Sequence, residues 1–101
     1  MKKFKILLEG NNYLLRVDEK PSRKFGFFMT FFVEARNAEE AEGMAVELLK
    51  NDSKLRDSIE NNDVDPPTVI VDAIKETHSF EGCKLPRTGL VLFDEEKETE
   101  I

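Results

Sequence analysis

The sequence predicts an α+β fold, in which an antiparallel four- or five-stranded sheet carries one main amphipathic helix on one face. Residues 25–36 are rich in aromatic and β-favouring side chains and hold no proline, which is typical of a strand. At Asn37 the apolar spacing changes from two residues to a helical period. The 101 residues suffice for one compact domain. The expected order is strand, an optional second strand, long strand, helix, strand, strand, and one version of this order is a ferredoxin-like variant without a second long helix.

The first two strands are expected at residues 3–8 and 12–17. Gly10-Asn11 separates these apolar runs, and both residues tolerate the positive φ of a tight hairpin turn. The hairpin register would form one apolar face from three opposed pairs: Leu8 with Tyr13, Ile6 with Leu15, and Phe4 with Val17.

The long strand over residues 25–36 is apolar on both sides. Alternation places one set of side chains on one face, namely Phe25, Phe27, Met29, Phe31, Val33 and Ala35. The opposite face receives Gly26, Phe28, Thr30, Phe32, Glu34 and Arg36. This pattern predicts a central strand with both of its sides covered.

A helix is expected after Asn37, which caps it, with Glu40 returning a hydrogen bond to the cap. Its buried stripe is predicted to hold Ala38, Ala41, Met44, Ala45, Leu48 and Leu49. Asn51-Asp52 ends this helix, and Ser53 caps a short second turn that holds Leu55 and Ile59.

Pro66-Pro67 marks a firm break before the last two strands, residues 68–77 and 89–93. In the first of these, alternation puts Val69, Val71 and Ala73 on one face, and Thr68, Ile70, Asp72 and Ile74 on the other. In the last strand, Leu90 and Leu92 oppose Val91 and Phe93. We therefore expect a single domain over residues 1–93, followed by an acidic tail over residues 94–101.

Charge excludes some classes of protein. The net charge is −6, and the excess acid lies in residues 39–65 and in the tail. Such a chain repels phosphate backbones, so we expect no nucleic-acid partner. No apolar run reaches the roughly 20 residues of a membrane helix, and no export signal is visible. Because Cys83 is the only cysteine, a reducing compartment is indicated, and we expect a cytoplasmic protein without a membrane partner.

Candidates for chemistry are few. His78 is the only histidine, and Cys83 follows it five residues later without any recognised catalytic or zinc motif. The glycines are scattered, so no phosphate-binding loop is present. We therefore predict no catalytic residue, no metal site and no cofactor.

Residues 26–35 read Gly-Phe-Phe-Met-Thr-Phe-Phe-Val-Glu-Ala and lead into an Ala/Glu-rich segment, and residues 89–93 read Gly-Leu-Val-Leu-Phe. These segments resemble a family of small uncharacterised bacterial proteins. In that family a Gly-Phe-Tyr-Thr-Thr-Arg strand precedes an Ala/Glu-rich helix, and a Gly-aromatic-x-Phe-Tyr strand ends the chain. Phe28, Phe31 and Phe93 stand where the family often has Tyr, Arg and Tyr, so a site built on those polar groups would be missing. The resemblance implies the fold order and no activity.

Phe28 and Phe32 are the predicted interaction surface. One amphipathic helix covers one face of a sheet, whereas these two rings lie on the face opposite Phe27 and Phe31. With Leu7, Ile70 or Val91 they would form a patch that monomers seldom expose, to be covered by the same chain, a second copy or another protein.

The resulting interpretation is a non-catalytic interaction module, either a homodimer or a binder of another protein. Its sharper version is an acidic binder of the immunity or antitoxin kind, because the acidic surface of residues 39–65 and the tail would steer a basic partner. The alternative is a small enzyme or ligand-binding domain with a pocket near His78 and Cys83.

Overall fold

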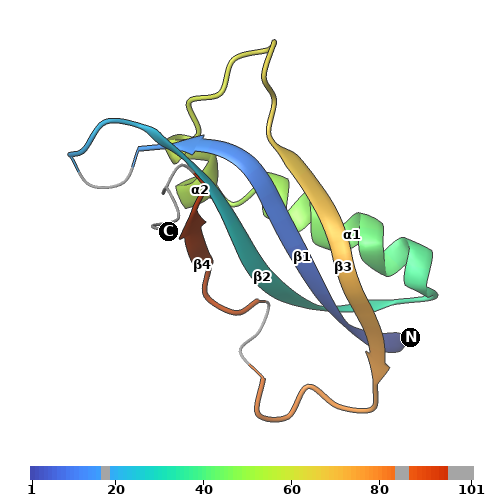
Figure 1. Cartoon of the computed structure of the whole chain (residues 1–101). Coiled ribbons are helices and arrows are strands. Elements are labelled where there is room, and N and C mark those ends of the chain that lie inside the picture. Colours follow the sequence, from blue (N-terminus) through green and yellow to red (C-terminus); the bar gives the residue numbers. More distant parts are fainter. Residues whose placement is uncertain (17–18, 84–86, 96–101) are drawn as a thin grey trace, which may run out of the picture.

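The computed structural model describes residues 1–16, 19–83 and 87–95 and consists of one antiparallel sheet with two helices (Figure 1). In chain order the elements are β1 (Lys2–Leu15), β2 (Arg23–Ala35), α1 (Ala38–Lys50), α2 (Ser53–Ser58), β3 (Thr68–Thr77) and β4 (Val91–Asp94). The four strands lie in the order β3-β1-β2-β4, and each neighbouring pair is antiparallel. The α+β class and the antiparallel sheet are confirmed. The element order differs from the expected one in part. One long strand, β1, covers both the first strand and the optional second strand, and the short second turn is the helix α2. β1 and β2 are adjacent with no helix between them, unlike a ferredoxin-like fold.

The hairpin expected at Gly10-Asn11 is wrong, because β1 continues through it. Gly10 pairs with Phe27 and Tyr13 pairs with Phe25, so Asn11 and Asn12 lie opposite Gly26 alone and β1 has one extra residue at this bulge. Asn12 takes the positive φ, at 61°. A continuous β1 hydrogen-bonds to β2 on one side and to β3 on the other, which a tight turn at this point would prevent. The expected pairs of Leu8 with Tyr13 and Ile6 with Leu15 therefore lie along one strand, and Val17 lies outside the described residues.

The core lies between the sheet and α1. The predicted inward face of β2 is confirmed, since Phe27, Met29, Phe31, Val33 and Ala35 are all buried. The same layer receives inward side chains of the other elements: Phe4, Ile6, Leu8, Tyr13, Leu15, Ala41, Ala45, Leu49 and Leu55.

The contact stripe of α1 is narrower than expected. Ala41, Ala45 and Leu49 are buried, whereas Ala38 is exposed and Met44 and Leu48 are 39% and 40% exposed. The buried residues follow a single four-residue row, and neighbouring positions are rotated by about 100° around the helix axis. Met44 and Leu48 therefore lie beside the contact row, which corrects their predicted burial.

Side-chain caps fix both helices at their beginnings. The amide of Glu40 donates to Asn37 Oδ1 at 2.8 Å, as predicted. The Glu40 carboxylate instead accepts from the amide of Arg36, at 3.2 Å, rather than from Asn37. The cap of α2 is Asp52 and not Ser53: its carboxylate accepts from the amide of Leu55 at 3.1 Å.

The bounds of β3 are as predicted, but its faces change at a bulge. Leu7 pairs with Ala73 and Leu8 with Val71, which leaves Asp72 as an extra residue. Val69, Val71 and Ile74 consequently pack against the core, and Ala73 lies on the opposite face. The predicted faces of Ala73 and Ile74 are therefore wrong.

Candidate functional site

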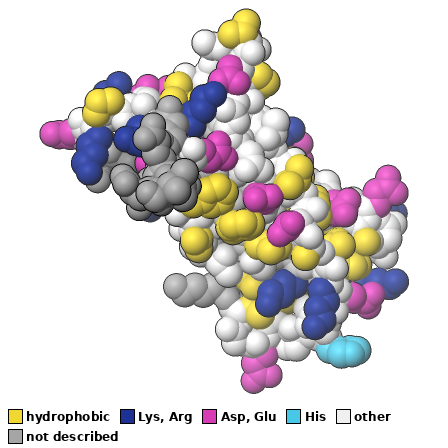
Figure 2. Space-filling model, viewed as in Figure 1, with side chains coloured by type: hydrophobic (Ala, Val, Ile, Leu, Met, Phe, Trp, Pro, Cys, Tyr) yellow, Lys and Arg dark blue, Asp and Glu magenta, His cyan; other side chains and the backbone are white. Residues whose placement is uncertain are grey.

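The candidate site is the face of the sheet that points away from α1, called the open face below. The pairing of the strands assigns to it Lys3, Lys5, Leu7 and Glu9 of β1, Phe28, Thr30 and Phe32 of β2, Ile70, Ala73 and Lys75 of β3, and Val91 and Phe93 of β4. Figure 1 is viewed onto this face, with α1 behind the sheet. Figure 2 shows hydrophobic side chains along its middle with charged side chains around them.

The two predicted interaction residues lie on the open face in different surroundings. Phe32 is 7% exposed, and its ring packs against Phe80 with centroids 5.8 Å apart. Phe28 is half-buried, and its ring lies 5.5 Å from that of Phe93. Phe28 is therefore the accessible member of the pair, while a loop of the same chain covers Phe32.

Gly26 makes the position of Phe93 possible. A Cβ atom at Gly26 would lie 2.1 Å from the Phe93 ring, so the absence of a side chain lets this ring lie over the backbone of β2. The alternation of residues 89–93 already places Phe93 beside Val91, but the sequence gives no signal that Phe80 covers Phe32.

Apolar side chains from three other strands surround Phe28. Ile70 is 49% exposed, Val91 63% and Phe93 37%, and Leu7 is half-buried. Val91 pairs directly with Phe28, and Glu9 lies between Phe28 and Ile70 across the sheet. Phe28 and the two β4 side chains thus form one apolar group, and Glu9 separates it from Ile70, in a chain of which 36% of the residues are charged.

Two opposite charges flank the middle of the open face. Lys5 pairs across the sheet with Lys75 and Phe32, and Glu9 with Ile70 and Phe28, one on each side of Leu7. Within the described part of the chain, the side chain of Lys5 and that of the half-buried Glu9 form no hydrogen bond and no ion pair. Lys5 and Glu9 are therefore a cation and an anion on the open face that have no partner of opposite charge among the described residues.

His78 and Cys83 are not brought together. His78 is exposed directly after β3, and Cys83 is half-buried in a turn where its amide donates to the carbonyl of Phe80 at 2.9 Å. Within the residues described, no hydrogen bond joins the two side chains, and no group of three His, Cys, Asp or Glu could hold a metal ion.

A cavity of about 450 Å³ lies on the other side of the sheet, beside α2. Its apolar wall consists of Leu15, Met29, Leu55, Leu90 and Leu92. Arg87 and Asp52, which also line it, form an ion pair at 2.6 Å, and Asp52 additionally caps α2. These two charged groups are thus engaged in holding the fold together, and neither His78 nor Cys83 lines the cavity.

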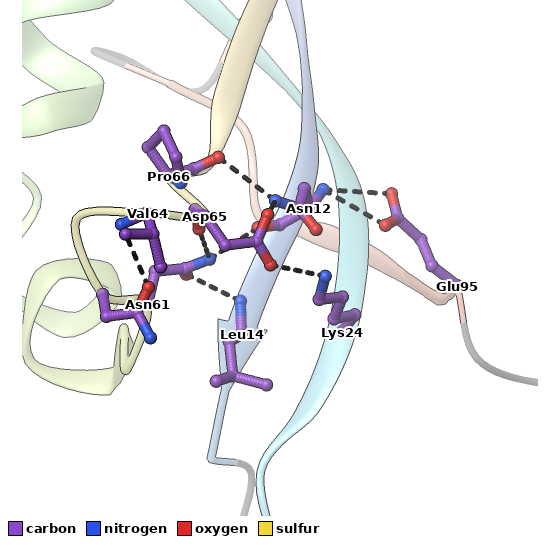
Figure 3. A network of polar contacts seen from close by, with 9 residues as sticks. Asn12, Leu14, Lys24, Asn61, Val64, Asp65, Pro66 and Glu95 are labelled. Atoms are coloured by element: carbon purple, nitrogen blue, oxygen red, sulfur yellow. Dashed lines mark hydrogen bonds and ion pairs between the residues drawn. The ribbon is translucent and has the colours of Figure 1, made fainter.

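A polar network anchors the bulge of β1 (Figure 3). The side-chain amide of Asn12 donates to Asp65 at 2.7 Å, and its backbone amide donates to the Glu95 carboxylate at 3.1 Å. Lys24 Nζ donates to the other Asp65 oxygen at 2.6 Å. Hydrogen bonds from Lys24 and Asn12 lower the pKa of Asp65. The network makes Glu95, the second residue of the expected tail, part of the fold, and residues 96–101 of that tail lie outside the described residues.

The acidic segment over residues 39–65 is partly neutralised within the chain. Glu40 pairs with Arg36 at 2.9 Å, Glu60 with Arg16 at 2.9 Å, and Asp65 with Lys24 at 2.6 Å. A hydrogen bond with Arg36 is the main reason why the pKa of Glu40 is lowered. For Glu60, the main reason for the lowered pKa is a hydrogen bond with Ser22. With the Asp52–Arg87 pair, four of the nine acidic side chains in this segment have a basic partner among the described residues.

No protein-family model, no curated protein and no solved structure matches this chain. The resemblance to the uncharacterised bacterial family stays a prediction. None of the helices within the described ranges is long and apolar enough to cross a membrane.

Proposed function

We propose that the chain is a non-catalytic, cytoplasmic interaction module that forms a homodimer through its open face. The observation that carries this proposal is the exposure of Ile70, Val91 and Phe93 on the face of the sheet that also carries Phe28 and that α1 does not cover. Burial of apolar surface is the main driving force of most protein associations. A second copy supplies a surface of the same apolar character.

The dimensions of the open face set the expected strength of association. From Lys3 to Asn11 of β1 the face is about 27 Å long, and three strand spacings make it about 14 Å wide. Its flat projection is on the order of 400 Å², whereas a stable interface buries about 800 Å² per partner. We therefore expect a weak dimer with a dissociation constant in the micromolar range.

The acidic-binder version receives less support than the homodimer. Ion pairs within the chain compensate Glu40, Asp52, Glu60 and Asp65, which reduces the field that would steer a basic partner. The enzyme or ligand-binding alternative receives no support from His78 and Cys83, since no contact joins their side chains among the described residues.

Sedimentation equilibrium of the purified chain over a range of micromolar concentrations tests the proposal. Val91→Asp introduces a charge opposite Phe28 at a side chain that is 63% exposed, so the fold is spared while association is lost. The matched control is Leu48→Asp on α1, where the side chain is 40% exposed on the opposite side of the molecule. We expect the control to dimerise as strongly as the wild type.

Two results would contradict the proposal. One is a wild-type chain that stays monomeric at the highest concentration reached. The other is a dimer that Leu48→Asp dissociates and Val91→Asp does not, which would place the interface on α1.

A further inference from the structure

The two charged side chains that β1 places on either side of Leu7 on the open face are self-complementary about this residue. Lys5 and Glu9 lie two residues before and two residues after Leu7 on β1, and all three side chains point to the open face. Lys5 and Glu9 are about 14 Å apart along the strand, too far for an ion pair within one chain. Neither has another partner among the described residues.

We propose that two copies pack face to face with their β1 strands antiparallel, an inference that rests on the proposed homodimer. A two-fold axis beside Leu7 relates the two copies and sets Lys5 of each copy opposite Glu9 of the other. A two-fold axis that lies in the interface at right angles to the strands exchanges the positions before Leu7 with those after it. Two equivalent Lys5–Glu9 pairs result, because every contact in a two-fold interface occurs twice.

The same rotation brings apolar parts of the two faces together. Leu7 meets Leu7 of the second copy near the axis, and Ala73 lies beside it on β3. Phe80, the loop residue that packs on Phe32 of β2, comes over Phe28 of the second copy. The spacing of about 10 Å between packed sheets leaves room for these side chains to interdigitate.

Charge distinguishes this arrangement from the other face-to-face dimer. With the axis along the strands, Lys5 would face Lys5 and Glu9 would face Glu9, so two like-charge contacts would replace two ion pairs. Of these two arrangements, the one with antiparallel β1 strands gives the half-buried Glu9 carboxylate a cationic partner.

Charge reversal tests the arrangement through the dissociation constant measured by sedimentation equilibrium. Lys5→Glu and Glu9→Lys each turn two attractive contacts into repulsive ones, and each is expected to weaken the dimer about thirtyfold. The double variant K5E/E9K exchanges the charges and restores the wild-type constant to within about threefold.

Net charge is controlled in two ways. Lys5→Glu makes the acidic chain more negative and Glu9→Lys makes it less negative, so an effect of net charge alone would weaken one dimer and strengthen the other. Lys50→Glu makes the same charge change as Lys5→Glu at an exposed position of α1, and its constant is expected to stay near that of the wild type.

The outcomes separate this inference from the proposed function. If Val91→Asp abolishes the dimer but the single reversals leave it intact, or K5E/E9K fails to recover it, the antiparallel arrangement is wrong and the interface stands. A monomeric wild-type chain overturns both.

Discussion

The two faces of the sheet use the same kinds of side chain for different purposes. On the inner face, Phe27 and Phe31 are 0% and 1% exposed under α1. On the open face, Phe28 is half-buried, and Val91 opposite it is 63% exposed. Both faces belong to the same central strand, so aromatic content alone does not distinguish core from contact surface. The covering helix makes the difference, because α1 packs on the inner face only.

The largest expected effect comes from a matched pair of phenylalanines on β2. Phe27→Ala removes a fully buried ring and should lower the free energy of unfolding by about 3 to 5 kcal/mol. Phe28→Ala removes a half-buried ring and should cost about 1 kcal/mol. Urea unfolding at concentrations where the chain is monomeric measures both values, and equal losses would contradict the distinction between the faces.

The second effect concerns Tyr13 of the inner face, whose ring is 5% exposed and packs edge-on against Phe27 at 4.8 Å. Burial raises the pKa of Tyr13 from 10.0 to about 12. Because the unfolded chain ionises first, stability is complete below pH 10.0 and is lost as the pH rises towards 12, by roughly 2 to 3 kcal/mol.

Tyr13 is the only tyrosine, and the chain has no tryptophan, so its phenolate absorbance is a clean probe. We expect Tyr13→Phe to lose less stability between pH 10 and 12 than the wild type does. Titration of Tyr13 near pH 10.0 in the folded protein would show that the ring is accessible to water.

A pair of glycines gives the next comparison. A Cβ at Gly10 would lie 2.3 Å from the buried Phe27 ring, and a Cβ at Gly26 would lie 2.1 Å from the Phe93 ring. Phe27 is enclosed, whereas Phe93 is 37% exposed and has room to move. We expect Gly10→Ala to destabilise the monomer by about 2 kcal/mol and Gly26→Ala by less than about 1 kcal/mol.

Gly26→Ala should nevertheless weaken dimerisation, because it displaces Phe93 from its place beside Phe28. Thermal unfolding and sedimentation of both variants separate the two effects. A Gly26→Ala dimer as strong as that of the wild type would remove Phe93 from the interface.

The smallest effect concerns Asp65, which lies on neither face and holds the bulge of β1. Because its pKa is lowered in the folded state, its contribution is present above its ordinary value of 3.8 and is lost as the pH falls below it. In the Asp65→Asn variant, the melting temperature should therefore fall less steeply below pH 3.8 than it does in the wild type. Thermal unfolding at a series of pH values measures this. The same pH dependence of the melting temperature in both proteins would show that Asp65 does not contribute to the loss of stability in acid.

Strong local patterns predicted much of this fold. Alternation was sufficient for both faces of β2, and Asn37 was correctly identified as the cap of α1. Gly10-Asn11 was misread, because the same backbone freedom suits a tight turn and a bulge, and only pairing with β3 decides between them. The bulge at Asp72 exchanged the faces of Ala73 and Ile74 for a similar reason, since register depends on the partner strand.

The candidate site was predictable in outline only. Alternation placed Phe28 and Phe32 away from the inner face, and this is where β2 carries them. Two other features depend on contacts between segments that are distant in the sequence: the ring of Phe80, in a loop, packs on Phe32, and the ring of Phe93 lies over Gly26. Local sequence therefore identified the face but not which of its rings stays accessible.

Backbone amide chemical shifts, followed by NMR while the protein is diluted, test the central claim most directly. Dissociation of the proposed dimer predicts concentration-dependent shifts at Leu7, Ile70, Ala73 and Val91, with no change at Met44 and Leu48 of α1. Shifts confined to α1, or none over the micromolar to millimolar range, would contradict an association through the open face.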